Sequence, residues 1–599
     1  MDVILCEKPS QGRAYAAAVG AKMKGTGLLK GNGFIVTWCL GHIVEQAEPH
    51  HYDPSYKKWS YDALPIIPQD YKLLVVKDKK PQFKIIADLL KKATRVFIAT
   101  DFDREGEAIA REVMDLCKYK GEILRIKCSS YEASDIRAAM KSPIKSSDTI
   151  AKYYAQQGRS RADWLLGMNL SRAFGLLYQS KLNGKRLTFS PSVGRVQTPL
   201  LNIISLREKA LWNFKPENYY HIEGVFNSSS GSFLATLNLD DEFKNEHGGL
   251  GSFDDAEQLG SALASNVAEV TAYKCSIIKA NAPLPYTPSK LNVDAEKLNI
   301  TTSDTKTELQ KLYEAGYVTY PRTDNGYLPK SMIDLVPSIF GHLSKHQDYQ
   351  PLIGLCDESF IGQCWNDVDA ELAAHHGIIP TVKYVERNQL PFKQLVIYDL
   401  ICKRFLQQFM GVRELEQRNV EVTMGTLLFK KTVKAEIKPG WTASEMSNRD
   451  SETNYLPPLT VGENVICDRC NTLTKTTTKP KRFTEASLVI EMGNAAKYVN
   501  DPNYMAIIKK SGLGTEATQG DILNNEIRKK NIVIKSGKVH LPVDVEDFLS
   551  FLPQEIKSVD TTSIWEEMLK LIEHGELPLN DFMAEIETFL HRTVENYKV

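Results

Sequence analysis

The fold of the amino-terminal region follows from the stretch Val96-Phe97-Ile98-Ala99-Thr100-Asp101-Phe102-Asp103-Arg104-Glu105-Gly106-Glu107. An apolar run typical of a buried strand leads into four carboxylates within seven residues, and a helical pattern follows from Ala108 to Met114. Such crowded carboxylates repel one another unless a cation, a helix N-terminus or water neutralises them. At the carboxyl end of a strand they suit a hard divalent cation such as Mg²⁺. The alternative is a solvated first helical turn whose acids complement the helix dipole.

Short apolar strands alternate with helices over residues 1–135, which predicts an α/β unit with a mainly parallel sheet. The strands are expected at 3–5, 33–38, 95–100 and 123–126. The first strand also ends in a carboxylate, Glu7, which Lys8 and a helix expected from Gln11 to Val19 follow. If the first strand and the 95–100 strand are neighbours, Glu7 and the Asp101 cluster meet at one edge of the sheet.

The remaining chain changes character several times, so we expect several domains, some of them discontinuous. Helices are expected over 150–210 with a Gly/Ser/Pro loop at 190–199, over 289–316, over 392–409 and from Thr484 onward. Strands are expected over 219–278, with a loop at 240–255, and over 420–473, which can return to the same sheet. A proline-rich boundary lies at 281–288.

Overall charge does not decide the ligand, because 74 basic residues balance 74 acidic ones. Basic residues nevertheless gather over 152–207 and 475–482, which suits a groove for a polyanion. The ten cysteines show no disulfide framework, so a reducing cytosol is expected. Only Cys467 and Cys470 have metal-ligand spacing, and without two further ligands nearby we expect no zinc. No apolar run reaches the ~20 residues of a membrane helix, so we expect a soluble protein.

A covalent mechanism is indicated by the absence of an ATP-binding phosphate loop and by a candidate nucleophile. The sequence has no G-x-x-x-x-G-K-[ST] phosphate loop, so chemistry driven by ATP through such a loop is not expected. A phosphodiester reaction must then hydrolyse its substrate or store the bond energy on a side chain. The candidate is Tyr320, because Pro321 favours an extended backbone there and Arg322 can grip a phosphate. The alternative is a packed aromatic, one of 25 tyrosines.

Seven separated motifs, spread over nearly the whole chain, resemble those of type IA DNA topoisomerases, and of the bacterial topoisomerase III subgroup most. They are residues 6–10, 101–107, 159–164, 192–199, 319–324, 374–381 and 512–518. The resemblance implies a multidomain protein of α/β, α and β parts, with a Toprim (Rossmann-like) domain in a ring of four domains. The implied domains are Toprim (1–135), helical DNA-binding (150–215 and 484–599), β-rich arch (216–280 and 411–483) and tyrosine-bearing catalytic (281–410).

The resemblance also implies the chemistry. Tyr320 would attack a backbone phosphate of single-stranded DNA, forming a 5′-phosphotyrosyl bond and freeing a 3′-hydroxyl, and another strand would pass before rejoining. Glu7 and Lys8 would move the proton or stabilise charge at the 3′-oxygen, Arg322 would hold the phosphate, and His375, with His376 as rival, would assist. Mg²⁺ would be held by Glu7, Asp101 and Asp103, with Glu105 as a further candidate. DNA would contact Trp59, Arg161, Ser192, Val193, Gly194, Arg195, Val196 and Gln197.

Three departures from the family pattern stand out: Phe102 in place of a common proline, Gly377 in place of a common alanine, and Gln519 in place of the usual arginine. The last puts in doubt DNA binding or strand control by the loop before it. The chain also ends without the cysteine-rich zinc modules of many topoisomerase I relatives, which favours the topoisomerase III subgroup.

Partners and rivals follow from the same resemblance. We expect a monomer that acts on single-stranded DNA, junctions and catenanes, relaxes negatively supercoiled DNA, uses no ATP, and works with a helicase or single-strand-binding protein in the bacterial cytoplasm at the nucleoid. One alternative is a Toprim nuclease or primase, which would need the carboxylates but not the Tyr-Pro-Arg sequence. Another is a catalytically weakened DNA-binding accessory protein, against which intact Glu7, Asp101, Asp103, Tyr320 and Arg322 argue.

Overall fold

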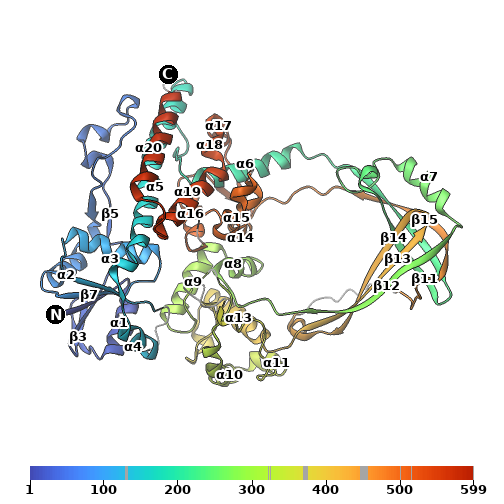
Figure 1. Cartoon of the computed structure of the whole chain (residues 1–599), viewed down its shortest axis with the longest axis horizontal. Coiled ribbons are helices and arrows are strands. Elements are labelled where there is room, and N and C mark those ends of the chain that lie inside the picture. The colour runs from blue at the N-terminus through green and yellow to red at the C-terminus, as the bar shows by residue number, and fades with distance from the viewer. Residues whose placement is uncertain are drawn as a thin grey trace.

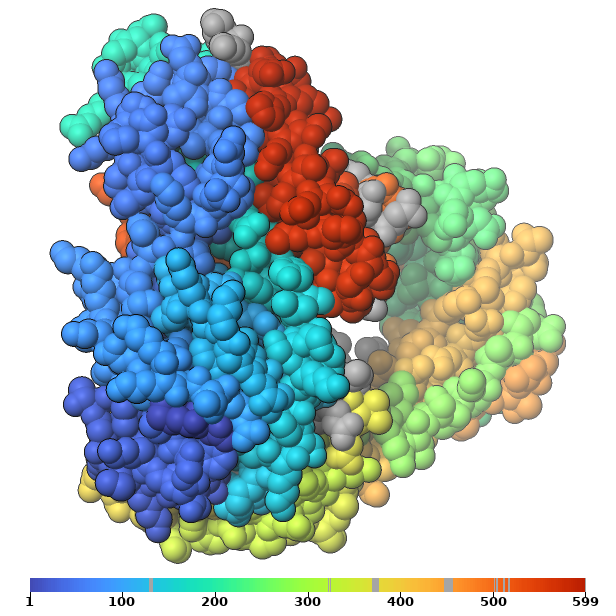
Figure 2. All heavy atoms as spheres, turned by 60° about the vertical axis from the view of Figure 1, so that its left-hand side comes forward, coloured from blue at the N-terminus to red at the C-terminus, as the bar shows by residue number. Residues whose placement is uncertain are grey.

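The chain forms a body of sheet and helices joined to a distant β-barrel (Figure 1). The computed structural model describes residues 1–128, 133–321, 323, 325–368, 376–445, 456–499, 501–514 and 516–597. Two pairs of connecting segments run from the body to the barrel and enclose an open space, which the space-filling view shows between them (Figure 2). Among the described residues, no helix combines the length and hydropathy that a membrane span requires.

The amino-terminal sheet has seven strands in the order β2-β3-β4-β1-β7-β8-β9. They are β2 (Met23–Gly25), β3 (Leu28–Gly31), β4 (Phe34–Trp38), β1 (Asp2–Cys6), β7 (Arg95–Ile98), β8 (Glu122–Arg125) and β9 (Ile144–Lys145). Strand β1 pairs in parallel with both β4 and β7, which confirms that the two strands ending near Glu7 and Asp101 are neighbours. Only the four central strands are parallel, since β2, β3 and β9 add antiparallel edges that the expectation of a mainly parallel sheet did not include.

Alternating residues of β1 face the two sides of this sheet. Val3 and Leu5 share a core with α2 (Lys80–Leu90) and α3 (Arg104–Leu116). Ile4 and Cys6 share the opposite core with α1 (Pro9–Val19) and α4 (Ala133–Lys141). The strand is therefore buried on both faces, and its carboxyl end is the part left for chemistry.

The turn from β7 into α3 is fixed by three local contacts. Asp103 is the N-cap of α3, because its Oδ1 accepts a hydrogen bond of 2.7 Å from the Gly106 amide. The Thr100 hydroxyl donates to the Gly106 carbonyl at 2.7 Å. A Cβ added to Gly106 would lie 2.1 Å from the Asp101 carbonyl oxygen, so only glycine lets the backbone approach this closely.

The helical body combines two distant chain segments around one core. Helices α5 (Ile150–Lys181) and α6 (Gln197–Asn213) pack with α14 (Glu485–Gly493), α15 (Pro502–Ser511), α16 (Glu516–Arg528), α17 (Val543–Phe551), α18 (Gln554–Lys557), α19 (Val559–Glu573) and α20 (Leu579–Asn596), with a hairpin of β16 (Val533–Lys535) and β17 (Lys538–His540) between α16 and α17. The loop expected at 190–199 ends at Val196. The first turn of α6, where a proline is tolerated, contains Gln197, Thr198 and Pro199.

The barrel is closed by six strands in the order β10-β11-β14-β13-β12-β15. They are β10 (Asn218–Ser228), β11 (Gly231–Asn238), β14 (Leu427–Lys438), β13 (Arg413–Met424), β12 (Val267–Ala280) and β15 (Asn464–Thr476). The expected return of the second strand-rich part to the first sheet is confirmed by the pairing of β10 with β15. A helix, α7 (Phe253–Leu263), is capped by Ser252 and begins inside the expected loop at 240–255, so part of the segment expected to be strand is helical.

The described residues between 284 and 410 pack around a separate core with helices α8 (Pro288–Glu296), α9 (Thr302–Glu314), α10 (Val336–Leu343), α11 (Gln350–Ile353) and α13 (Phe392–Gln407). Side chains of this unit bridge to the helical body. The Thr484 hydroxyl donates to Glu296 at 2.6 Å, and Lys306 forms an ion pair with Asp521. The ring is therefore closed at this point by non-covalent contacts.

Candidate active site

Tyr320 lies against the carboxyl edge of the parallel strands, although Lys8, which it contacts, is 312 positions away in sequence. The Lys8 Nζ donates a hydrogen bond of 3.0 Å to the Tyr320 oxygen and lies 4.3 Å from the centre of its ring. The Tyr320 hydroxyl donates to Asp101 Oδ2 at 3.3 Å, and Lys8 reaches the same oxygen at 3.4 Å. The phenolic oxygen therefore has both a cation and a proton acceptor beside it.

Gln11 holds the two strand ends together, and the sequence patterns did not identify it as a site residue. It is 1% exposed; its Oε1 accepts from the Glu7 amide at 2.7 Å, and its Nε2 donates to Asp101 Oδ1 at 3.1 Å. Its place in the first turn of α1, four residues after Glu7, is the signal that could have identified it. Tyr313, whose ring meets the Tyr320 ring edge-on with centres 5.4 Å apart, had no such signal.

Glu7 is the most perturbed carboxylate of this edge. It is 8% exposed and accepts a hydrogen bond of 3.3 Å from the Asp101 amide. Burial, and then the neighbouring Asp101 charge, raise the pKa of Glu7 to about 7, although Lys8 opposes the shift. Burial also raises the pKa of Asp103. A nearby cation would stabilise the ionised form of both carboxylates.

The other two acids of the 101–107 stretch point elsewhere. Glu105 Oε1 lies 3.3 Å from His42 Nε2, and this hydrogen bond is the main cause of the raised His42 pKa. His42 was not predicted as a site residue. Glu107 is fully buried between Arg111 and Arg125, at 2.7 Å from each, so it is a structural ion-pair partner. The four carboxylates that are close in sequence therefore have different partners in the fold.

The predicted metal ligands are only partly assembled. Glu7, Asp101 and Asp103 offer the oxygen atoms that a hard divalent cation prefers, so the donor set fits in kind. In the described part of the chain, however, only Glu217, Glu246 and His247 bring three ligand atoms within 4.8 Å of one another, and that group lies on the barrel side. A cation at the sheet edge would therefore have to draw its carboxylates closer together.

Two predicted residues of the site, Arg322 and His375, lie outside the described residues. His376, the rival of His375, is described. Its Nδ1 lies 2.9 Å from the Gly377 carbonyl oxygen, and burial lowers its pKa, which favours a neutral imidazole. Gly377 is the departure from a common alanine, and an added Cβ would lie 2.7 Å from the Gly326 carbonyl oxygen. The glycine here is therefore required by close packing.

The loop before α6 does not present all of its predicted DNA contacts. Arg195 is buried, with Asp163 at 3.0 Å and Glu566 at 3.5 Å, so its side chain is engaged inside the protein. Val193 and Val196 are also buried. The amides of Val193 and Gly194 donate to Ser171 at 2.9 Å and to Thr198 at 3.0 Å. Both amides are therefore engaged inside the protein, while the side chains of Ser192 and Gln197 remain partly exposed.

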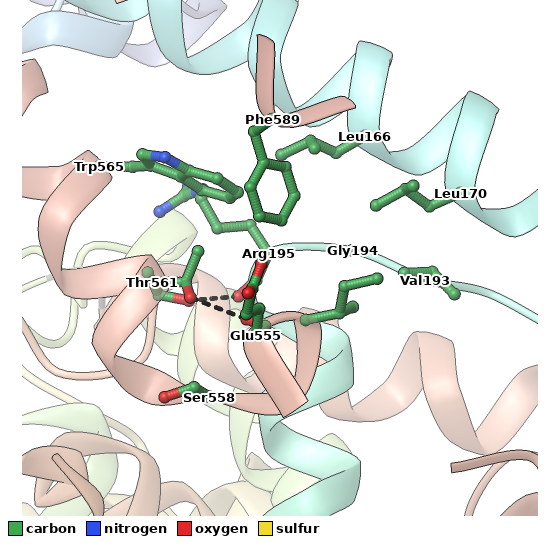
Figure 3. Close-up of a pocket in the computed structure, with 12 residues that line it drawn as sticks. Leu166, Leu170, Val193, Gly194, Arg195, Glu555, Ser558, Thr561, Trp565 and Phe589 are labelled. Carbon is green, nitrogen blue, oxygen red and sulfur yellow. Dashed lines mark hydrogen bonds between the residues drawn. The ribbon is translucent and has the colours of Figure 1, made fainter. Parts of the chain in front are cut away.

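A small cavity lies under this loop (Figure 3). Trp565 and Phe589 line it with Val193, Gly194 and Arg195, and Thr562 donates to the Arg195 carbonyl at 2.6 Å. Its volume of about 20 Å³ accommodates a water molecule but no base. The cavity therefore belongs to the packing that supports the loop.

Trp59 packs against α5, and Arg161 belongs to that helix. Trp59 is 43% exposed, and the Arg172 guanidinium lies 5.6 Å from the centre of its ring. A Cβ added to Gly175 would lie 3.3 Å from Trp59 and 3.2 Å from Pro191, so the tryptophan is close to the start of the 190–197 loop. Arg161 lies over the Tyr71 ring at 4.8 Å and donates to Gln157.

The remaining departures also have structural explanations. The Phe102 ring has Arg125 at 5.0 Å and both Lys127 and Lys152 at 5.6 Å, so it packs among cations beside the acidic turn. Gln519 is 3% exposed and donates to the Gly514 carbonyl at 3.0 Å. It stabilises the turn before α16, and its side chain does not reach the surface.

Comparison with known proteins gives a consistent picture. Residues 147–584 match the family described as DNA topoisomerase, and residues 2–130 match the Toprim domain. The DNA topoisomerase 3 of Vibrio cholerae is 31% identical over 619 positions, which cover all of this chain and 94% of the relative. The DNA topoisomerase 3 of Bacillus licheniformis is 32% identical, with all of this chain and 81% of the relative covered.

The fold is also found among solved structures. Full-length topoisomerase I from Thermotoga maritima matches with a TM-score of 0.65 at 22% sequence identity, and the match covers all of this chain and 91% of that one. At this identity the likeness concerns the fold alone.

Proposed function

This chain belongs to the type IA DNA topoisomerase family, and we propose that Tyr320 is its cleaving residue. As a family member it cleaves one DNA strand, passes another through the break and rejoins the first without ATP. The observation that carries the assignment is the contact of the Tyr320 oxygen with both Lys8 and Asp101.

The proposed step begins with transfer of the phenolic proton from Tyr320 to Asp101, the acceptor 3.3 Å away. The tyrosine oxygen forms a bond to the phosphorus, and the bond from phosphorus to the 3′-oxygen breaks. Lys8 stabilises the negative phenolic oxygen before attack, and Lys8 with Glu7 supplies charge or a proton to the leaving 3′-oxygen. Attack by the 3′-hydroxyl on the phosphotyrosyl bond reverses each change and rejoins the strand.

We propose that Glu7, Asp101 and Asp103 hold Mg²⁺, with Glu105 as a further ligand once it leaves His42. When bound, the cation neutralises these carboxylates and positions the DNA phosphates for rejoining. The Toprim match supports a divalent cation in general. Arg322 and His375 are proposed to hold the scissile phosphate, on the strength of their motifs alone.

The DNA path is proposed to run along α5 and the loop before α6. Trp59 would stack on a base, and Arg161, Ser192 and Gln197 would contact the backbone. Val193, Gly194, Arg195 and Val196 would act by holding the loop in shape, since their side chains or amides are already engaged.

Finer points of the organisation are also proposals. The separate cores support one domain over 1–135, a helical domain from 150–215 and 484–599, an arch from 216–280 and 411–483, and a tyrosine-bearing domain over 281–410. We infer a monomer that acts at the nucleoid on single-stranded DNA, junctions and catenanes, with a helicase or single-strand-binding protein as partner.

The decisive experiment is covalent trapping of DNA. The protein is mixed with a labelled single-stranded oligonucleotide and Mg²⁺ and then denatured with detergent, and the label is followed to the protein band. Wild type should form the adduct, and Tyr320→Phe should form none, because the phenol has no hydroxyl to attack with. Tyr317→Phe is the matched control, since its ring contacts Lys383 instead of the acidic edge. Metal-dependent cutting without an adduct would replace this proposal with a nuclease.

A further inference from the structure

A cavity of about 410 Å³ lies where the tyrosine-bearing unit meets the helical body. Residues of α8 and α9 line one side, and residues of α14 and α16 line the other; these helices adjoin in Figure 1. The volume is in the range of ligand-binding pockets. Pro321, which follows the proposed nucleophile directly, is also part of the wall. The cavity therefore adjoins the active site and bridges two units that must separate when a strand passes.

Polar side chains with unused hydrogen-bonding capacity face this cavity. Asn292 is only 8% exposed, yet within the described part of the chain no group hydrogen-bonds to its carboxamide. The same holds, among described residues, for the side chains of Asn524 and Thr302. These polar atoms are open to the cavity, where water can hydrate them. A ligand whose polar groups replace that water can therefore bind there.

The lining indicates the chemistry of that ligand. Asn292 on α8 and Asn524 on α16 offer the paired donor and acceptor with which carboxamides bind the edges of bases. Leu309 and Val489 add apolar surface for a flat ring. Lys306 contributes a cation at the wall, held in an ion pair with the exposed Asp521 that an incoming phosphate can replace.

We propose that this gate cavity binds one nucleotide unit, with its base between Asn292 and Asn524 and its phosphate toward Lys306. The source is either a free mononucleotide or one residue of the DNA strand, and in the second case the inference rests on the proposed function. Because the ligand contacts both sides, it binds only when the two units are together. By mass action it therefore favours the closed ring and delays opening.

The test measures binding to the full-length protein carrying Tyr320→Phe, so that no DNA is cut. Deoxyadenosine 5′-monophosphate and a labelled single-stranded oligonucleotide are titrated separately into this protein and into the same protein with Asn292→Ala or Asn524→Ala added. Each substitution should weaken binding of the ligand that uses the cavity by about tenfold, the usual effect of losing a buried polar contact. Asn525→Ala is the matched control, since Asn525 is the next residue of α16 but does not line the cavity.

Every outcome decides the proposal. Weaker mononucleotide binding in both variants supports a free nucleotide as ligand, and weaker oligonucleotide binding alone supports the DNA strand. Binding of both ligands that is equal in all variants overturns the proposal, as does absence of binding. Thermal unfolding identifies a misfolded variant, and Asn524→Ala, at the less buried position, then decides. Adduct formation by wild type is measured separately, so failure here leaves the role of Tyr320 untouched.

Discussion

Lys8 joins the proposed nucleophile to the acidic edge of the sheet. Its ammonium contacts the Tyr320 oxygen at 3.0 Å and Asp101 Oδ2 at 3.4 Å, and its side chain is 21% exposed. A cation this close favours negative charge on the phenolic oxygen during attack and on the leaving oxygen afterwards. Its contribution should therefore be seen in the rate of cleavage more than in the stability of the fold.

Replacing Lys8 with alanine should slow adduct formation by about 10²- to 10³-fold, the usual effect of removing one group that stabilises developing charge. Lys8→Arg should recover part of the rate, because it keeps the charge but changes the geometry. Single-turnover cleavage of an oligonucleotide measures this. Lys22→Ala, at an exposed position, is the control. An unchanged rate in Lys8→Ala would remove Lys8 from the mechanism.

The sequence predicts that Glu7 and Asp101 are neighbours, but it does not predict the side chain that bridges them. Glu7 and Asp101 could be brought together because parallel neighbours end at the same edge of a sheet. Neither Gln11, which bridges them, nor the withdrawal of Glu105 to His42 follows from spacing, because both depend on tertiary contacts. The burial of Arg195 was missed for the same reason, since its partner Glu566 is 371 positions away.

At the level of elements, α3 depends on the residue that is also proposed to bind metal. Asp103 caps the helix through the Gly106 amide, and burial raises its pKa. Because the pKa of Asp103 is raised in the folded state, ionisation of this carboxyl destabilises the fold. The loss of stability begins as the pH rises above the pKa in the unfolded chain, near ~4, and is complete once the pH exceeds the pKa in the folded state. Without metal at pH 7, a neutral capping side chain should therefore be at least as stable.

Asp103→Asn tests this, because asparagine caps as well as aspartate but carries no charge. In EDTA it should unfold at or above the temperature of wild type, whereas Asp103→Ala should lose about 1 kcal/mol of stability with the cap. Added Mg²⁺ should raise the unfolding temperature of wild type more than that of Asp103→Asn. Equal shifts in the two proteins would show that Asp103 is not a ligand.

The elements that periodicity predicted are those whose faces differ clearly in polarity. Strand β1 and helix α3 were expected because apolar runs end in charged or capping residues. The antiparallel edge β2–β3 was missed, since Met23, Lys24 and Gly25 are all exposed and lack alternation. Helix α7 was missed because its first turn, with Asp254 and Asp255, is as polar as a loop.

At the scale of the whole molecule, strand passage requires that the ring open where no covalent bond closes it. The Lys306–Asp521 ion pair and the bond from Thr484 to Glu296 cross the junction between the tyrosine-bearing unit and the helical body, and Lys8 contacts Tyr320 across the neighbouring junction. The barrel is joined to both units by the connecting segments of the chain. Opening should therefore break these side-chain contacts while the barrel keeps the units connected.

A covalent cross-link across the junction between the tyrosine-bearing unit and the helical body should block strand passage but leave cleavage intact. A protein with Lys306→Cys and Asp521→Cys, both exposed positions, is joined by a short reducible thiol-reactive linker. After cross-linking, adduct formation with an oligonucleotide should continue, because the closed ring already brings Tyr320 to Lys8. Relaxation and decatenation should fall at least about tenfold, because the cross-link raises the free energy of ring opening by more than ~1.4 kcal/mol. Reduction of the linker should restore both activities. Wild type treated with the same linker controls for its ten native cysteines. Strand passage that continues at full rate in the cross-linked protein would place the gate elsewhere in the ring.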